Sequence, residues 1–291
     1  MTETVVLRMG SMGDIILAAP ITRALGPVTF VTHARWADLV RRLPGVVRVV
    51  AWPDDPLPVA PDRVVDLQAD LRARWLVHTM QPAHATHIHR HDWTRRARVW
   101  LGAAPAPRVV HRYAQAAGIA VPEGPWLERS PPAHHIVLVP GAKWATKRWP
   151  ATAWVSLGRR LAGPVVVLGG PDDGELVDTI ARGIGPDATP LTERGFDRTF
   201  ATIGSARAVV AGDTGLMHLA GAMGVPLVAL FGPTTSVDGF WCHAGRVVEV
   251  DLPCRPCSRH GSASCGRGHH ACMNLLPVAS VHAALQAVVD P

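Results

Sequence analysis

The strongest constraint on the fold is a strand, a glycine-bearing turn and a helix that follow one another at the start of the chain. The apolar run Thr4–Met9 predicts a strand buried on both faces, because it lacks alternating polar residues. Gly10–Asp14 predicts the turn, and Ile15–Leu25 predicts a helix that bends or begins late at Pro20. This order is typical of the first unit of a doubly wound α/β sheet.

The same alternation continues in two series on either side of a Pro- and Gly-rich stretch, residues 103–134, which holds one short helical piece at Arg112–Ala117. The first series predicts strands at Val28–Thr32, Val46–Ala51, Val64–Leu67 and Thr86–His89, with helices at Arg35–Leu43 and Ala69–Met80. The second predicts strands at His135–Val139, Pro164–Leu168, Ala208–Ala211 and Pro226–Phe231, with helices at Ala151–Leu161, Asp173–Arg182, Asp197–Ser205 and Gly215–Ala222. We therefore expect two α/β domains, residues 1–130 and 131–291.

Composition places the chain among globular proteins and argues against a membrane span. Of 291 residues, 48% are hydrophobic and 18% are charged, which suffices for a buried core. No apolar stretch approaches the roughly 20 residues that a spanning helix needs. Asp14 and the glycines before it interrupt the first apolar run, so a secretory signal is not expected and the predicted compartment is cytoplasmic.

The net charge of +6 lies mostly before Ala133 and is densest in the His- and Arg-rich run His84–Arg98. Such a run suits an anionic partner or a membrane surface, and a solvated arginine-rich helix face is the alternative. A nucleic-acid partner is not expected, because only 5% of residues are aromatic and no RNA- or DNA-binding motif occurs.

Lysine is rare in this chain, yet both lysines stand four residues apart. Lys143 and Lys147 are the two lysines among 29 basic residues, in a loop that follows the expected strand His135–Val139. An ammonium group is a compact charge that suits phosphate, so this loop predicts a diphosphate cradle, with coincidence as the alternative. The loop does not match the Walker pattern, so a nucleotide triphosphatase is not indicated.

Two further polar turns follow expected strands. Asp14 stands at the carboxyl end of the first strand, where open α/β sheets bind ligands, although an N-cap role would also explain it. A helix N-terminus favours the ionised carboxylate, which predicts a general base. Gly212–His218 offers a similar turn, in which Asp213 or Thr214 could also be a simple cap. Three such turns in one chain favour a shared ligand site.

In this order Arg8–Asp14, Gly141–Pro150, Gly212–His218 and Ala229–Thr234 resemble glycosyltransferase family 9, the lipopolysaccharide heptosyltransferases. The resemblance implies a GT-B fold, in which two Rossmann-like domains face each other across a cleft. It implies that residues 1–130 bind the acceptor and residues 131–291 bind the nucleotide sugar. The implied reaction is the inverting transfer of a heptose from ADP-heptose to a lipopolysaccharide inner-core or related glycan acceptor, with no cofactor required for catalysis.

The resemblance also implies roles for single residues. Asp14 is similar to the family's catalytic base, and Lys147 is similar to its diphosphate-binding lysine. The implied acceptor loop comprises Ser11, Met12 and Gly13, and the implied donor site comprises Lys143, Thr146, Lys147, Asp213, Thr214, Gly215 and His218.

Four of the five cysteines lie within a segment of 19 residues: Cys254, Cys257, Cys265 and Cys272. The first pair has the spacing of a zinc knuckle and the second does not. Because the expected compartment is reducing, the segment predicts a structural zinc site, with two disulfides, free thiols or an iron–sulfur site as alternatives. Cys242 is expected to be a spare buried thiol.

Other functions stay open at this point. They are an inverting GT-B transferase with a different nucleotide sugar, a GT-B epimerase of free nucleotide sugars, and a catalytically silent GT-B-like module on an anionic surface. The implied acceptor is an anionic glycolipid or oligosaccharide, with peripheral contact at the cytoplasmic face of the inner membrane.

Overall fold

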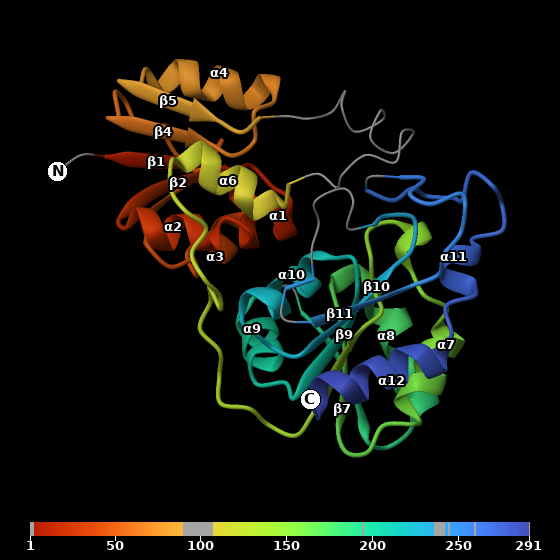
Figure 1. Ribbon diagram of the computed structural model, residues 1–291. Helices are drawn as coiled ribbons and strands as arrows, with labels where there is room; N and C mark the ends of the chain where they lie inside the picture. Colours follow the sequence, from red (N-terminus) through yellow and green to blue (C-terminus); the bar gives the residue numbers. More distant parts are fainter. Residues whose placement is uncertain are drawn as a thin grey trace. The chain divides into compact units, whose positions relative to one another are not determined.

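The computed structural model describes residues 3–89, 107–193, 195–235, 242–243, 245–258 and 260–290. The chain divides into two compact units, Met1–Leu127 and Glu128–Pro291, each with one parallel sheet between layers of helices (Figure 1). The expected boundary lay between residues 130 and 131. The predicted α/β class is confirmed.

The sheet of the first unit has the order β3-β2-β1-β4-β5. All its strand pairs are parallel, as short strand–turn–helix units require. Its strands are β1 (Thr4–Leu7), β2 (Val28–His33), β3 (Val46–Trp52), β4 (Arg63–Asp66) and β5 (His84–His87). Its helices are α1 (Met12–Ile16), α2 (Ala19–Leu25), η1 (Ala34–Trp36), α3 (Ala37–Val40), α4 (Leu71–Met80) and α6 (Val109–Ala117).

Helices cover both faces of this first sheet, and α4 and α6 lie on opposite sides of β4 and β5 (Figure 1). The buried side of α4 closes one core, in which Leu76 and Met80 pack with β-strand residues such as Leu7 and Val64. On the other side α6 packs against α2.

The sheet of the second unit has the order β11-β10-β9-β6-β7-β8, and all its strand pairs are parallel. Its strands are β6 (Ile136–Val139), β7 (Val165–Gly169), β8 (Ala188–Thr192), β9 (Ala208–Gly212), β10 (Leu227–Phe231) and β11 (Gly245–Glu249). Its helices are η2 (Ala145–Lys147), α7 (Ala151–Gly158), η3 (Pro171–Asp173), α8 (Gly174–Ile184), α9 (Asp197–Gly204), α10 (Gly215–Ala222), α11 (Ala271–Asn274) and α12 (Val278–Val289). Helices α7, α8 and α12 cover one face, and α9 and α10 cover the other (Figure 1).

Several elements differ from the sequence prediction. The expected helix Ile15–Leu25 is two helices, with Pro20 in the first turn of α2, where its missing N–H leaves no helical bond unmade. Strands β8 and β11 were not predicted, because both are edge strands with mostly exposed side chains and little apolar signal. Helix α12 was not predicted, although its buried Val281 and Leu285 complete the core of the second unit.

Two further expectations concern surfaces. No helix in the described parts of the chain is long and apolar enough to cross a membrane. Of the basic run His84–Arg98, residues 90–98 lie outside the described residues, and the part before them forms β5 and the two residues after it.

Candidate functional site

The strand order decides where polar turns of each unit gather. In each sheet the connection reverses direction beside the first strand of its unit, between β1 and β4 and between β6 and β9. Ligands of doubly wound sheets bind at the carboxyl ends of strands at such a reversal. The turn with Asp14 follows β1, and those with Lys147 and Asp213 follow β6 and β9.

Asp14 lies in α1, and its carboxylate is the centre of a polar cluster in the first unit. Arg8 Nη2 lies 2.6 Å from Asp14 Oδ2, and the two side chains are 12% and 19% exposed. Ser11, the N-cap of α1, donates to the same oxygen from its backbone N–H at 3.2 Å and from its hydroxyl at 3.0 Å. The Tyr113 hydroxyl of α6 lies 3.5 Å from Asp14 Oδ1.

The charges of this cluster keep Asp14 ionised. Burial acts to raise the pKa of Asp14, but the Arg8 charge and the hydrogen bonds from Ser11 outweigh it and hold this pKa below its ordinary value. Burial and the neighbouring Asp14 raise the pKa of Tyr113, so its hydroxyl keeps its proton. An ionised carboxylate with one exposed edge can accept a proton from a hydroxyl group.

Sequence reasoning missed two members of this cluster, Arg8 and Tyr113. Arg8 also donates to the carbonyl of Leu67 at 2.5 Å and lies 5.9 Å from the centre of the Tyr113 ring. Arg8 could have been recognised as a candidate because it is an arginine at the end of an otherwise apolar strand. Tyr113 could have been recognised because it is the one tyrosine of the sequence. Of the expected acceptor loop, Ser11 is exposed, Met12 is half-buried and Gly13 is buried inside α1.

In the second unit the structure brings Lys147 and Asp213 together. Lys147 Nζ lies 2.5 Å from Asp213 Oδ2 and 3.3 Å from the Asp213 carbonyl oxygen. The Thr234 hydroxyl, from the loop after β10, donates to the same carboxylate at 2.7 Å. The Lys147 and Asp213 side chains are 12% and 5% exposed. An ammonium group has three donors, so Lys147 keeps donor capacity beyond these two contacts.

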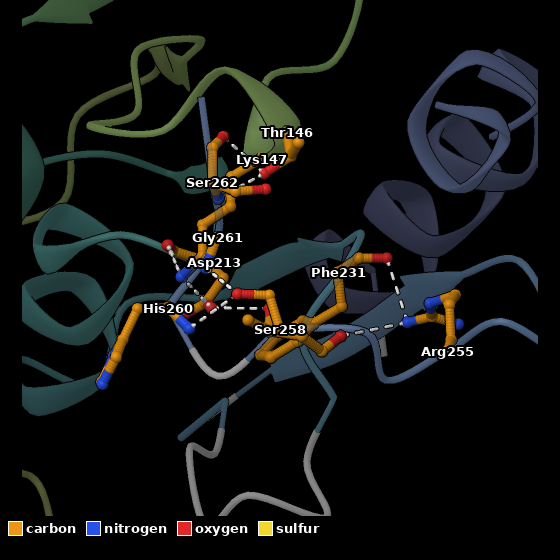
Figure 2. Close-up of polar contacts among 10 residues, drawn as sticks. Thr146, Lys147, Asp213, Phe231, Arg255, Ser258, His260, Gly261 and Ser262 are labelled. Atoms are coloured by element: carbon orange, nitrogen blue, oxygen red, sulfur yellow. Dashed lines mark hydrogen bonds and ion pairs between the residues drawn. The ribbon is translucent and has the colours of Figure 1, made fainter. Parts of the chain in front are cut away.

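Thr146, which was expected in the donor site, contacts the cysteine-rich segment. Its hydroxyl accepts from the Ser262 N–H at 2.8 Å and donates to the Ser262 carbonyl at 2.9 Å (Figure 2). His270 Nε2 lies 2.8 Å from the Thr146 carbonyl oxygen. Thr146 therefore ties the cysteine-rich segment to the loop that carries Lys147, and its hydroxyl is already occupied.

A second tie joins the cysteine-rich segment to the loop after β10. The Arg255 guanidinium donates to the carbonyls of Phe231, Gly232, Thr234 and Val250 and pairs with Glu249 at 2.7 Å. Its side chain is 5% exposed. Figure 2 shows Arg255 beside Phe231, at the end of β10. Arg255 thus fixes the segment that places the Thr234 hydroxyl on Asp213, and no motif in the sequence pointed to it.

The remaining expected donor residues differ in their surroundings. Lys143 is exposed, lies 5.3 Å from the centre of the Trp144 ring and takes no part in the Lys147 network. Thr214 is the N-cap of α10, and its hydroxyl oxygen is buried with no hydrogen-bond partner among the described residues. Gly215 opens α10, and His218 is buried one turn later.

The cysteines are free thiols. Burial first, and then the neighbouring thiols, raise the pKa of Cys257 and Cys272, whereas backbone N–H groups, first that of His270, lower the pKa of Cys265. Among the described residues no group of three or more His, Cys, Asp or Glu side chains is arranged to hold a metal ion. Zinc stays a prediction that metal analysis of protein purified without chelator can test.

Comparison with known proteins places this arrangement in a family. The profile of glycosyltransferase family 9 (heptosyltransferase) matches residues 111–265, more than half of the chain. The chain belongs to glycosyltransferase family 9. It is 30% identical over 221 residues to lipopolysaccharide heptosyltransferase 1 of Pseudomonas aeruginosa, an alignment that covers 67% of this chain and 61% of that relative. The aligned part is thus less than two thirds of the relative.

Solved structures of the family agree with the fold. A family 9 glycosyltransferase from Veillonella parvula matches with a TM-score of 0.75 at 16% identity, over 99% of this chain and 97% of that one. The Escherichia coli heptosyltransferase WaaC with ADP matches with a TM-score of 0.72 at 17% identity, over 99% of this chain and 100% of that one. These likenesses confirm the predicted GT-B class of two Rossmann-like domains.

Proposed function

We propose that this family 9 protein is an inverting glycosyltransferase that moves a heptose from ADP-heptose to an inner-core or related glycan acceptor. The observation that carries the proposal is the Lys147–Asp213–Thr234 network at the carboxyl ends of three neighbouring strands. A buried cation with donor capacity to spare, beside a helix N-terminus, suits a diphosphate group.

The acceptor half of the reaction falls to Asp14. Its carboxylate accepts the proton of the acceptor hydroxyl while that oxygen forms a bond to the anomeric carbon of the sugar. The bond from the anomeric carbon to the diphosphate oxygen breaks in the same displacement, which inverts the anomeric centre. Arg8 and Ser11 hold the Asp14 carboxylate in one orientation, so they act as positioning residues.

The donor half of the reaction falls to the second unit. Charge develops on the leaving ADP, and Lys147 with the N-terminus of α10 stabilises it. The unpartnered Thr214 hydroxyl at that N-terminus supplies a further hydrogen bond to a phosphate oxygen. Asp213 keeps the Lys147 ammonium in place between strands β6 and β9.

Two similar proteins support this donor and acceptor. The P. aeruginosa relative is named a lipopolysaccharide heptosyltransferase, and the E. coli structure is described with ADP. A different nucleotide sugar stays the main alternative, because none of the contacts described above reads the sugar ring or the base. Because the relative is a lipopolysaccharide heptosyltransferase, we propose that the acceptor is an anionic, lipid-linked glycan.

The test is calorimetric titration of the protein with ADP, ADP-heptose, UDP and UDP-glucose. We expect selective binding of the two ADP compounds, weakened at least about tenfold in Lys147→Ala because a charge-assisted contact to phosphate is lost. Lys143→Ala is the matched control: it removes the other lysine, which is exposed and outside the network, so we expect a smaller loss.

Each outcome decides between the candidate functions. A preference for the uridine compounds would keep the mechanism and replace the donor. Binding of none of the four would favour the silent module. Conversion of ADP-heptose to another free nucleotide sugar without an acceptor would identify an epimerase.

A further inference from the structure

Helix α4 exposes two large apolar side chains on its outer surface. Leu71 is 85% exposed and Trp75 is 56% exposed, and four residues separate them, so they are neighbours on one stripe of the helix. Isolated exposed leucines are common in globular proteins, but a leucine and a tryptophan side by side form an apolar patch.

An arginine flanks this patch on each side. At about 100° per residue, Arg72 lies on one side of the Leu71–Trp75 stripe, while Arg74 and His78 form a parallel stripe on the other. All three flanking side chains are exposed. Long basic side chains beside an apolar stripe can keep their charged ends in the aqueous or headgroup layer while the stripe enters an apolar layer.

The opposite side of α4 fixes this orientation. Ala73, Leu76, Val77 and Met80 are buried in the core of the first unit, so the helix cannot turn its apolar stripe inward. No acidic residue occurs within α4, and the Asp70 carboxylate before it is engaged with the Ala73 N–H and the Gln68 side chain. The exposed face is therefore cationic and apolar at once.

A cavity of about 900 Å³ adjoins the same face. Arg74 and His78 of α4 line it together with His87 and His89, which belong to β5 and the residues after it. No ion pair to Arg74 occurs within the described residues. A hollow that holds the Arg74 charge next to an exposed apolar stripe suits the anionic headgroup of an amphiphile rather than a free sugar.

We propose that the outer face of α4, centred on Leu71 and Trp75, docks on an anionic lipid bilayer. Tryptophan and leucine enter the interfacial region, while Arg72 and Arg74 meet acidic headgroups. With ten residues, α4 lies on the surface and does not cross it. The proposal rests on the proposed function, since a lipid-linked acceptor would be presented at such a surface.

The experiment is vesicle flotation of the full chain with phosphatidylcholine vesicles and with mixed phosphatidylcholine–phosphatidylglycerol vesicles. We expect binding to the mixed vesicles that weakens as salt is raised. Leu71→Glu/Trp75→Glu should lower the partition at least about tenfold, since two inserted apolar groups become charged. Val47→Glu, at a residue 72% exposed on β3 of the same unit, is the matched control and should bind as the wild type does.

A second pair of variants tests the charges separately. Arg72→Gln/Arg74→Gln should lower the partition about fivefold for each arginine removed, because each contributes about 1 kcal/mol at an anionic surface and that energy corresponds to about fivefold. Arg48→Gln, an exposed arginine of β3, is the control for charge alone. Equal flotation with neutral and mixed vesicles, or with the α4 variants and the wild type, would overturn the proposal.

Two further readouts separate this proposal from others. If analytical ultracentrifugation shows a dimer for the wild type and a monomer for Leu71→Glu/Trp75→Glu, the face binds a second copy of the chain. That result would overturn the proposal of bilayer docking. Titration of the same variant with ADP reports on the donor site alone. If ADP binds and vesicles do not, the docking surface fails while the proposed function stands.

Discussion

The two units each place a carboxylate beside a cation at the end of a strand, but they assemble the pair differently. In the first unit Arg8, Ser11 and Asp14 come from seven consecutive residues, so β1 and α1 alone bring them together. In the second unit Lys147 and Asp213 are 66 residues apart, and Thr234 comes from a third strand end.

The second pair also depends on the cysteine-rich segment. Thr146 bonds to Ser262 across 116 residues, and Arg255 fixes the loop that carries Thr234. The Arg8–Asp14 site is local and should survive changes elsewhere in the chain. The Lys147–Asp213 site is built from distant segments and should respond to changes in any of them. The following predictions test that difference.

The largest effect is expected at Asp14. Asp14→Asn should lower turnover at least about 100-fold, since the amide cannot accept a proton, and should leave ADP affinity unchanged. Single-turnover transfer assays and ADP titration measure the two effects. Ser11→Ala, which removes one hydrogen bond to the same carboxylate, is the control and should lower turnover far less. Near-normal turnover in Asp14→Asn would reject the base.

Breaking the second pair should destabilise the fold of its unit. Asp213→Ala leaves the Lys147 ammonium buried without its carboxylate, and we expect a loss of about 3 kcal/mol in the free energy of unfolding. Urea unfolding followed by tryptophan fluorescence measures this loss. Lys147→Met/Asp213→Ala removes both charges and should recover most of the stability. A single variant as stable as the wild type would show that the pair contributes nothing to folding.

The local pair should instead respond through pH. Arg8 lowers the pKa of Asp14, so Arg8→Gln should raise this pKa and move the acid limb of the rate profile to higher pH. Activity that needs ionised Asp14 is then lost earlier as the pH falls. Turnover measured across the acid range checks the shift. A profile that falls in height without moving would assign Arg8 a structural role only.

The smallest effect is expected where the cysteine-rich segment meets the donor loop. Thr146→Val keeps the side-chain shape but removes both side-chain hydrogen bonds to Ser262, which should destabilise this contact by about 1 kcal/mol and weaken ADP binding severalfold. Hydrogen exchange should rise at Gly261 and Ser262. Thr189→Val, at an exposed residue of β8, is the control. If hydrogen exchange at Gly261 and Ser262 is unchanged in Thr146→Val, the cysteine-rich segment does not depend on its contact with the donor loop.

The residue pattern was enough to predict the α/β class, most of the elements and the three polar turns. It did so because strand, turn and helix are local patterns, as in Thr4–Met9 followed by Gly10–Asp14. It also singled out the two lysines by their rarity, although rarity alone could not tell Lys147, inside the network, from Lys143, outside it.

Tertiary structure alone decided which side chains meet. Tyr113 reaches Asp14 across 99 residues, and the Thr146 hydroxyl bonds to Ser262 across 116 residues. Edge strands β8 and β11 and the clamp of Arg255 were equally invisible, because none has a local pattern that differs from an ordinary loop. Pairings between distant residues are fixed by strand order and packing, and neither is written in the spacing of neighbouring residues.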